Sequence, residues 1–149
     1  MAITMQKPRK IFLGGTQNPV IIADVPAGGT ITPGHLIERY DAGSGVVKWR
    51  VHSTQAGAAA KAVALNWSSM NKGVDDNYTA SDLMEAIIAP SGVNLWMIIA
   101  SGQNIAIGNF LESAGDGTLR IYNAGVRLFQ ALETIATVTV TTRIRVEAL

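Results

Sequence analysis

Hydrophobic residues in this chain gather in short runs that are rich in β-branched and aromatic side chains. Glycine and proline interrupt these runs at short intervals, for example at 28–29, 43–45 and 115–117. Glycine supplies the positive φ angles of tight turns and proline fixes φ, so both residue types mark strand ends. The pattern predicts strands at 20–25, 35–40, 46–52, 62–66, 83–89, 93–100, 110–113, 119–122, 126–133 and 141–148.

Apolar and charged residues alternate within two of these predicted strands. In the segment 47–51, valine and tryptophan occupy the odd positions, and Lys48 and Arg50 occupy the even ones. In 144–147, isoleucine and valine alternate with arginine and glutamate. A period of two places each set on its own face of a half-buried strand. Short strands with glycine-rich turns predict an all-β fold, a small β-barrel or sandwich.

The segment 81–100 has two interpretations. Ser81 and Glu85 could form the capped start of a helix. However, the turn sequence at 90–92 follows at once, and a second apolar run begins behind it. Two apolar runs joined by a short Pro/Gly turn are typical of a β-hairpin, so the sequence favours a hairpin of 83–89 and 93–100.

The sequence partly repeats itself after a shift of 74 residues, which aligns 27–38 with 101–112. A glutamate ends each of the two aligned segments. The identical pairs are Gly28/Gly102, Ile31/Ile105, Gly34/Gly108 and Glu38/Glu112. The agreement predicts an internal duplication with pseudo-twofold symmetry. Two unrelated β-corners that share a common turn sequence are the alternative.

The composition indicates a protein whose surface is partly covered. Charged residues make up 15% of the chain, against about 25% in typical soluble domains. Hydrophobic residues make up 48%, and the formal net charge is +1. Low charge favours self-assembly or burial against a partner. A net charge near zero also provides no field that would attract nucleic acid or an anionic membrane.

The N-terminal segment concentrates the basic charge. Lys7, Arg9 and Lys10 precede the first acidic residue, Asp24, and Pro8 disfavours regular structure between them. We therefore predict an extended arm at 1–12, followed by one barrel-like domain at 13–149.

The arm is expected to bind a partner. Its cations would face acidic side chains, and its apolar residues would fill grooves. The candidate partner-binding residues are Lys7, Arg9, Lys10, Ile11 and Phe12, together with Ile3 and Met5.

The sequence offers little catalytic or metal-binding chemistry. It contains no cysteine, which excludes disulfides, thiolate metal sites and cysteine nucleophiles. His35 and His52 have no metal-site spacing and are interpreted as structural, and Asp75, Asp76 and Asp116 as turn residues. We expect no enzymatic activity, cofactor or bound metal. No apolar run has the length of a membrane span and no secretory signal is evident, so synthesis in the cytosol is expected.

Several segments resemble the head decoration, or capsid cement, proteins of tailed bacteriophages. The resemblance covers roughly 20–149. One long segment that carries it is 100–120, in which 102–120 is the most specific part. The other segments that carry it are 36–40, 72–78, 131–133 and 143–147.

This resemblance implies a structural virion protein that is made in the host bacterial cytoplasm and binds the exterior of the phage head. It further implies the major capsid protein as a partner and a small homo-oligomer, with a trimer preferred over a dimer. Two other functions remain open. One is a β-protein of the tail or baseplate, and the other is a small-ligand or sugar-binding domain of β-clip type, which a concave polar pocket would favour.

Overall fold

The protein is described here by a computed structural model that covers residues 7–136 and 142–149. Strands dominate the described residues, and the only helical element among them is a 3-10 turn (η1, Ser68–Met70). None of the described residues forms a helix that could span a membrane. All ten predicted strands are present, and β1 is an additional one. The strands are β1 (Phe12–Gly14), β2 (Val20–Pro26), β3 (Leu36–Asp41), β4 (Val47–Val51), β5 (Ala62–Ala64), β6 (Leu83–Ile88), β7 (Asn94–Ile99), β8 (Phe110–Ser113), β9 (Leu119–Ile121), β10 (Phe129–Ala131) and β11 (Thr142–Ala148).

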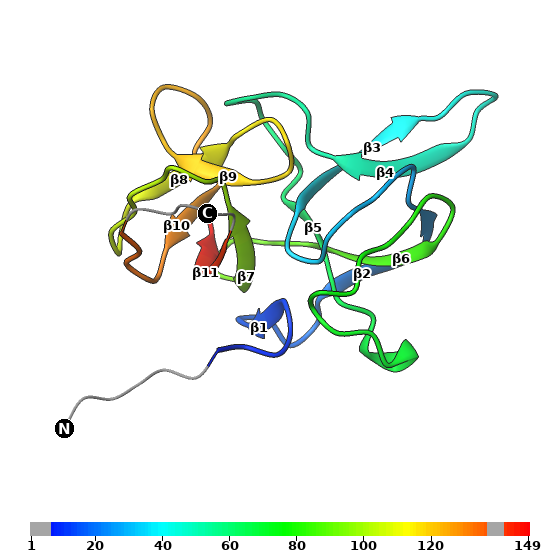
Figure 1. The fold of residues 1–149 in the computed structure, drawn as a ribbon, viewed down its shortest axis with the longest axis horizontal. Coiled ribbons are helices and arrows are strands. Elements are labelled where there is room, and N and C mark those ends of the chain that lie inside the picture. The colour runs from blue at the N-terminus through cyan, green and yellow to red at the C-terminus, as the bar shows by residue number, and fades with distance from the viewer. Residues whose placement is uncertain (1–6, 137–141) are drawn as a thin grey trace.

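Strands β2 to β11 form two units that follow one another along the chain and lie side by side in Figure 1, and β1 pairs with β7 at the edge of the second unit. In the second unit the order is β7-β11-β10-β8-β9, and a parallel contact of Ile99 with Leu119 closes these strands into a barrel. In the first unit the order is β2-β6-β5-β3-β4. A parallel bridge between Ala27 and Trp49 joins its outer strands at one point. The all-β prediction is confirmed.

The two units have the same strand order, which confirms that the sequence repeat is a structural repeat. The matched residues Ile31 and Ile105 each form an antiparallel bridge, with Tyr78 and Ile135 respectively. Two β-corners with a common turn sequence would not reproduce a whole five-strand arrangement with the same closing contact. The repeat therefore extends well beyond the segments in which the sequence detects it.

The repeated turn before β3 and β8 is held in the same way in both units. The Thr32 N–H donates to Nδ1 of His35 at 3.1 Å, and the Ala106 N–H donates to Oδ1 of Asn109 at 2.8 Å. The glycine before each of these side chains has a positive φ, +96° at Gly34 and +89° at Gly108. Burial lowers the pKa of His35 by more than the nearby Asp116 carboxylate raises it. The lowered pKa favours the neutral ring, and Nδ1 must be unprotonated to accept the Thr32 N–H.

The units share one hydrophobic core. Leu36, Val63 and Ile87 of the first unit belong to the same buried cluster as Leu95 and Phe129 of the second. A smaller cluster around Trp49 and Tyr78 lies within the first unit alone. Burial of large side chains contributes about 1.5–3 kcal/mol each, so the shared cluster fixes the two units against each other.

The predicted hairpin of 83–89 with 93–100 is wrong, and so is the helical alternative. Both segments are strands, but β6 pairs with β2 and β5, whereas β7 pairs with β1, β11 and β9. The turn at 90–92 is the connection between the two units. The strands that pair with β6 and with β7 come from distant parts of the chain, so the turn between them does not bring the two together.

Candidate functional site

The structure divides the predicted partner-binding residues into two groups. Lys7, Arg9 and Lys10 are exposed, and no acidic side chain of the described residues forms an ion pair with them. Ile11 is completely buried, and Phe12 is half-buried in β1. The predicted residues Ile3 and Met5 lie outside the described residues.

Ile11 and Phe12 are part of the folded body, so the arm ends earlier than the predicted boundary at residue 12. The Ile11 N–H donates to Oδ1 of Asn66 at 3.1 Å, and the Ile11 carbonyl accepts the Trp96 N–H at 2.9 Å. Phe12 lies opposite Leu95 in the β1–β7 pair. Ile11 fills the shared core of its own chain. The exposed cations remain the part of this segment that a partner can reach.

A groove of about 830 Å³ lies beside the exposed segment. Lys7 and Pro8 line it, together with apolar side chains of the second unit. Among these apolar residues, Ile107 is 67% exposed at the tip of the repeated turn. Ile107 therefore provides one exposed apolar contact point at the edge of the groove.

The two arginines that line this groove are paired within the chain. Arg143 donates from Nη1 to Asp75 at 2.9 Å and from Nε to the Pro33 carbonyl at 3.1 Å, and its guanidinium lies 5.2 Å from the ring centre of Trp96. Arg145 forms an ion pair with Glu133. The arginines therefore offer no uncompensated charge for a phosphate. Arg143 also covers one face of the indole on which a sugar ring could stack.

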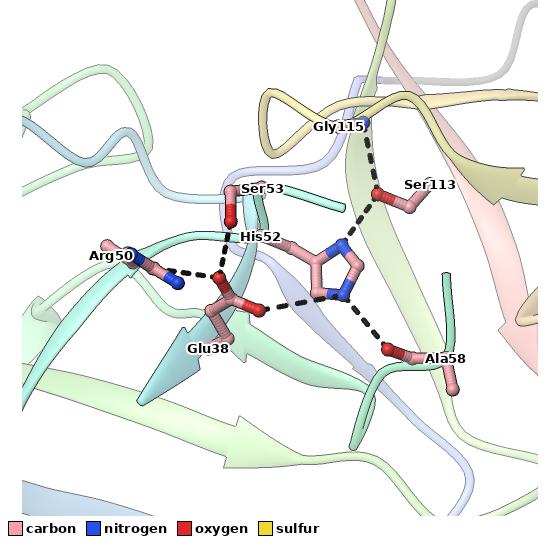
Figure 2. A network of polar contacts seen from close by, with 7 residues as sticks. All are labelled: Glu38, Arg50, His52, Ser53, Ala58, Ser113 and Gly115. Carbon is pink, nitrogen blue, oxygen red and sulfur yellow. Dashed lines mark hydrogen bonds and ion pairs between the residues drawn. The ribbon is translucent and has the colours of Figure 1, made fainter. Parts of the chain in front are cut away.

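A buried polar network joins the two units (Figure 2). Nδ1 of His52 lies 2.7 Å from Oγ of Ser113, and Nε2 lies 3.0 Å from the carbonyl oxygen of Ala58. A carbonyl can only accept, so the ring proton is on Nε2, and Nδ1 accepts the serine hydroxyl. The Gly115 N–H donates to the same hydroxyl at 3.1 Å. The carboxylate of Glu38 approaches Nε2 to 3.7 Å.

Serine, histidine and glutamate are the residue types of a hydrolytic triad, but their arrangement differs from one. Ser113 has no exposed surface and His52 is 2% exposed, so a substrate cannot reach the hydroxyl. In a triad, the ring nitrogen that does not face the serine donates its proton to the carboxylate, and this hydrogen bond orients the ring. Here that nitrogen is Nε2 of His52, and it donates to the backbone carbonyl of Ala58. The geometry fits a polar connection between β4 and β8 that closes the interface between the units.

The matched glutamates of the repeat each pair with an arginine on the neighbouring strand. Glu38 accepts Nε of Arg50 at 2.8 Å, and Glu112 accepts Nε of Arg120 at 2.9 Å. The side chain of Glu38 is 24% exposed, whereas that of Glu112 has no exposed surface. Burial opposes ionisation of both, but hydrogen bonds outweigh it and lower the pKa of each carboxyl below its ordinary value. The two glutamates therefore stabilise the two β-ribbons, each through its own arginine.

Sequence reasoning missed the groove and the partners of its arginines. The alternating pattern at 143–147 places Arg143 and Arg145 on one strand face, which could have indicated a cationic surface. Their acidic partners come from distant segments, and no local pattern reports them. In the described parts of the chain, no group of three or more His, Asp or Glu side chains is placed to hold a metal ion.

A scan of protein-family models finds no match to this chain, and a search of curated proteins finds none either. Its fold is similar to a solved structure, the N base of the head fibre protein gp8.5 of bacteriophage phi29. The TM-score is 0.59, with 12% sequence identity, and the match covers 89% of this chain and 95% of that chain. The similarity thus extends over both units. At this level of identity it establishes a common fold.

Proposed function

We propose that this chain is a structural protein of a tailed-bacteriophage virion, which binds the outside of the head and reinforces the major capsid protein lattice. The observation that carries the proposal is the fold similarity to a phage head fibre base, which includes nearly all of both chains. The resemblance of 102–120 to head decoration proteins supports the same location. The low content of charged residues fits a protein that works with much of its surface covered.

The exposed basic segment and the groove beside it support the major capsid protein as the partner. Lys7, Arg9 and Lys10 lack acidic partners among the described residues, whereas the groove arginines are neutralised. A partner with acidic side chains facing the basic segment and an apolar side chain facing Ile107 would match this surface. A second copy of the chain is the other proposed partner, and we expect a trimer.

Binding to heads tests this function directly. We expect the purified chain to decorate tailless mature heads of the phage that encodes it, at regular lattice positions on the outer surface. Electron cryomicroscopy of the mixture, compared with heads alone, measures the added density. Isolated tails of the same phage serve as the control. Decoration of tails but not heads would favour a tail or baseplate protein, and binding to neither would contradict a virion role.

Deletion of residues 1–10 is expected to leave the fold intact and to weaken head binding. The fold persists because Ile11 and β1, which contact the core, remain in the shortened chain. Exposed ion pairs contribute only about 0–1 kcal/mol each, so loss of three cations is expected to weaken binding by no more than about two orders of magnitude. Cosedimentation with heads over a range of protein concentrations measures the affinity.

A full-length variant with Lys7, Arg9 and Lys10 replaced by glutamine separates charge from chain length. Its affinity should approach that of the intact protein at high salt, where exposed charges are screened. Equal affinities of the deletion variant and the intact chain at low salt would show that this segment does not contact the capsid.

A further inference from the structure

The β3–β4 and β8–β9 hairpins occupy the same place in the two units and end in the same turn. The Ala42 N–H donates to the Val46 carbonyl at 2.8 Å, and the Ala114 N–H donates to the Thr118 carbonyl at 2.9 Å. Each turn contains two glycines with positive φ, in matching positions. These pairs are Gly43 with Gly115 and Gly45 with Gly117.

The two hairpins differ in length and in exposure. Ala42 lies six residues after the start of β3, whereas Ala114 lies four residues after the start of β8. The first hairpin therefore extends further from its unit, and Figure 1 shows it pointing away from the second unit. Its Val46 and Val47 are 47% and 48% exposed. The corresponding residues of the shorter hairpin, Thr118 and Leu119, are 4% and 0% exposed.

The shorter hairpin docks on the first unit through its glycine turn. Gly117 inserts between the start of β3 and the end of β4, where its carbonyl accepts the Leu36 N–H at 2.8 Å and its N–H donates to the His52 carbonyl at 3.1 Å. A Cβ atom at Gly117 would lie 2.8 Å from Cβ of Val51, so the turn fits only without a side chain. The fold thus contains one complete example of a hairpin of one unit bound to the other unit.

The second unit has the corresponding backbone position, and among the described residues no backbone group is hydrogen-bonded there as Gly117 is in the first unit. The Tyr122 N–H donates to the Phe110 carbonyl at 2.8 Å, as the His52 N–H donates to the Leu36 carbonyl at 2.9 Å. In the first unit, the His52 carbonyl accepts the Gly117 N–H. The corresponding Tyr122 carbonyl accepts no backbone hydrogen bond from the described residues.

The surface around this position has the composition of a protein interface. The guanidinium of the exposed Arg127 lies 4.5 Å from the ring centre of Phe110 and 4.8 Å from that of Tyr122. Aromatic residues and arginine are enriched at the centres of protein–protein contacts. The long hairpin is complementary to this surface, because its tip carries two exposed valines and the carboxylate of Asp41.

We propose that the β3–β4 hairpin of one copy docks on the second unit of another copy, with Gly45 placed against the Tyr122 carbonyl. The contact repeats between chains the one that Gly117 makes within each chain. The occupant is a second copy because the hairpin points away from the second unit of its own chain. The proposal identifies the self-association surface of the protein and stands whether or not the chain binds heads.

This contact joins two different surfaces, so successive copies associate head to tail and can close into a ring. A ring of three copies would contain six units related by similar contacts. That arrangement would give the trimer expected for a head protein a structural basis.

Sedimentation velocity at micromolar concentration tests the proposal. We expect the intact protein to sediment with the mass of three chains of 15.8 kDa each. Val46→Asp combined with Val47→Asp places charge on the hairpin, and Arg127→Glu reverses the charge of the docking surface. Each variant should weaken association at least tenfold. Met70→Asp, at a residue that is 60% exposed elsewhere, is the matched control and should behave as the intact protein.

Mixing the hairpin variant with the Arg127→Glu variant distinguishes this contact from a symmetric one. One intact hairpin and one intact docking surface remain in the mixture, so a species of twice 15.8 kDa is expected, with nothing larger. Circular dichroism of each variant checks that it is folded. An intact protein that stays at 15.8 kDa, full association of both variants, or a mixture without the two-chain species would overturn the proposal. Head binding by a monomeric protein would leave the proposed function standing.

Discussion

Gly117→Ala is expected to lower the free energy of unfolding by about 2–5 kcal/mol. At a φ of +84°, an alanine costs about 1–2 kcal/mol in backbone strain. Its Cβ would also lie 2.8 Å from Cβ of Val51, and overpacking of this kind costs about 1–3 kcal/mol. Because the Gly117 backbone binds Leu36 and His52, relief of the clash would also break these two hydrogen bonds between the units. Urea denaturation followed by circular dichroism measures the loss.

Gly45→Ala is the matched control for this substitution. Gly45 occupies the same turn position in the other hairpin and has a φ of +72°, but a Cβ there would meet no atom within 4 Å. Within one chain only the backbone strain of about 1–2 kcal/mol applies, so the two variants are compared at a protein concentration where the chain is monomeric. Equal losses for the two variants would show that the Gly117 turn does not hold the units together, and would remove the template for the contact between copies.

Glu112→Ala is expected to lower the free energy of unfolding by about 3 kcal/mol. The carboxylate has no exposed surface and accepts hydrogen bonds from Arg120 and from the Gly125 N–H. Removing one member of a buried ion pair costs about 3–5 kcal/mol. The lower figure applies because the side chain of Arg120 is 27% exposed and keeps part of its hydration. Urea denaturation at neutral pH provides the measurement.

Glu38→Ala provides the comparison, because the repeat places it in the same pair on the surface. Its partner Arg50 is 48% exposed, so the expected loss is about 1 kcal/mol or less. A loss for Glu38→Ala as large as that for Glu112→Ala would contradict the assignment of the larger effect to burial.

The pH dependence of the Glu112 variant follows from the lowered pKa of that carboxyl. Burial raises the pKa of Glu112, but hydrogen bonds from Arg120 and from two backbone N–H groups lower it by more. The pKa of Glu112 is therefore below its ordinary value of 4.5. The folded state therefore binds its proton less readily than the unfolded state. The stabilisation is fully present above pH 4.5 and is lost as the pH falls through the folded-state pKa. The difference between the intact protein and Glu112→Ala should shrink over that range.

The sequence determined where the strands are, because the signals for strands and turns are local. Alternation in 144–147 reflects the two faces of one strand, and Ile144 and Val146 are buried as that pattern requires. The repeat was visible at Gly34 and Gly108 because both must adopt a positive φ, which few other residues accept at low cost. The carboxylates of Glu38 and Glu112 were matched by the same alignment, although their arginine partners were not predicted.

Only the tertiary structure decided which strands pair and which polar residues meet. The turn at 90–92 has the composition of a hairpin, yet β6 and β7 belong to different units, since pairing depends on the edges that other strands present. Ile11 looks like part of an arm because basic residues precede it, but the gap in the core that it fills is created by residues far along the chain. The contact of His52 with Ser113 spans 61 residues, and that of Arg143 with Asp75 spans 68. Such contacts arise from packing one unit against the other, and a local pattern carries no information about that arrangement.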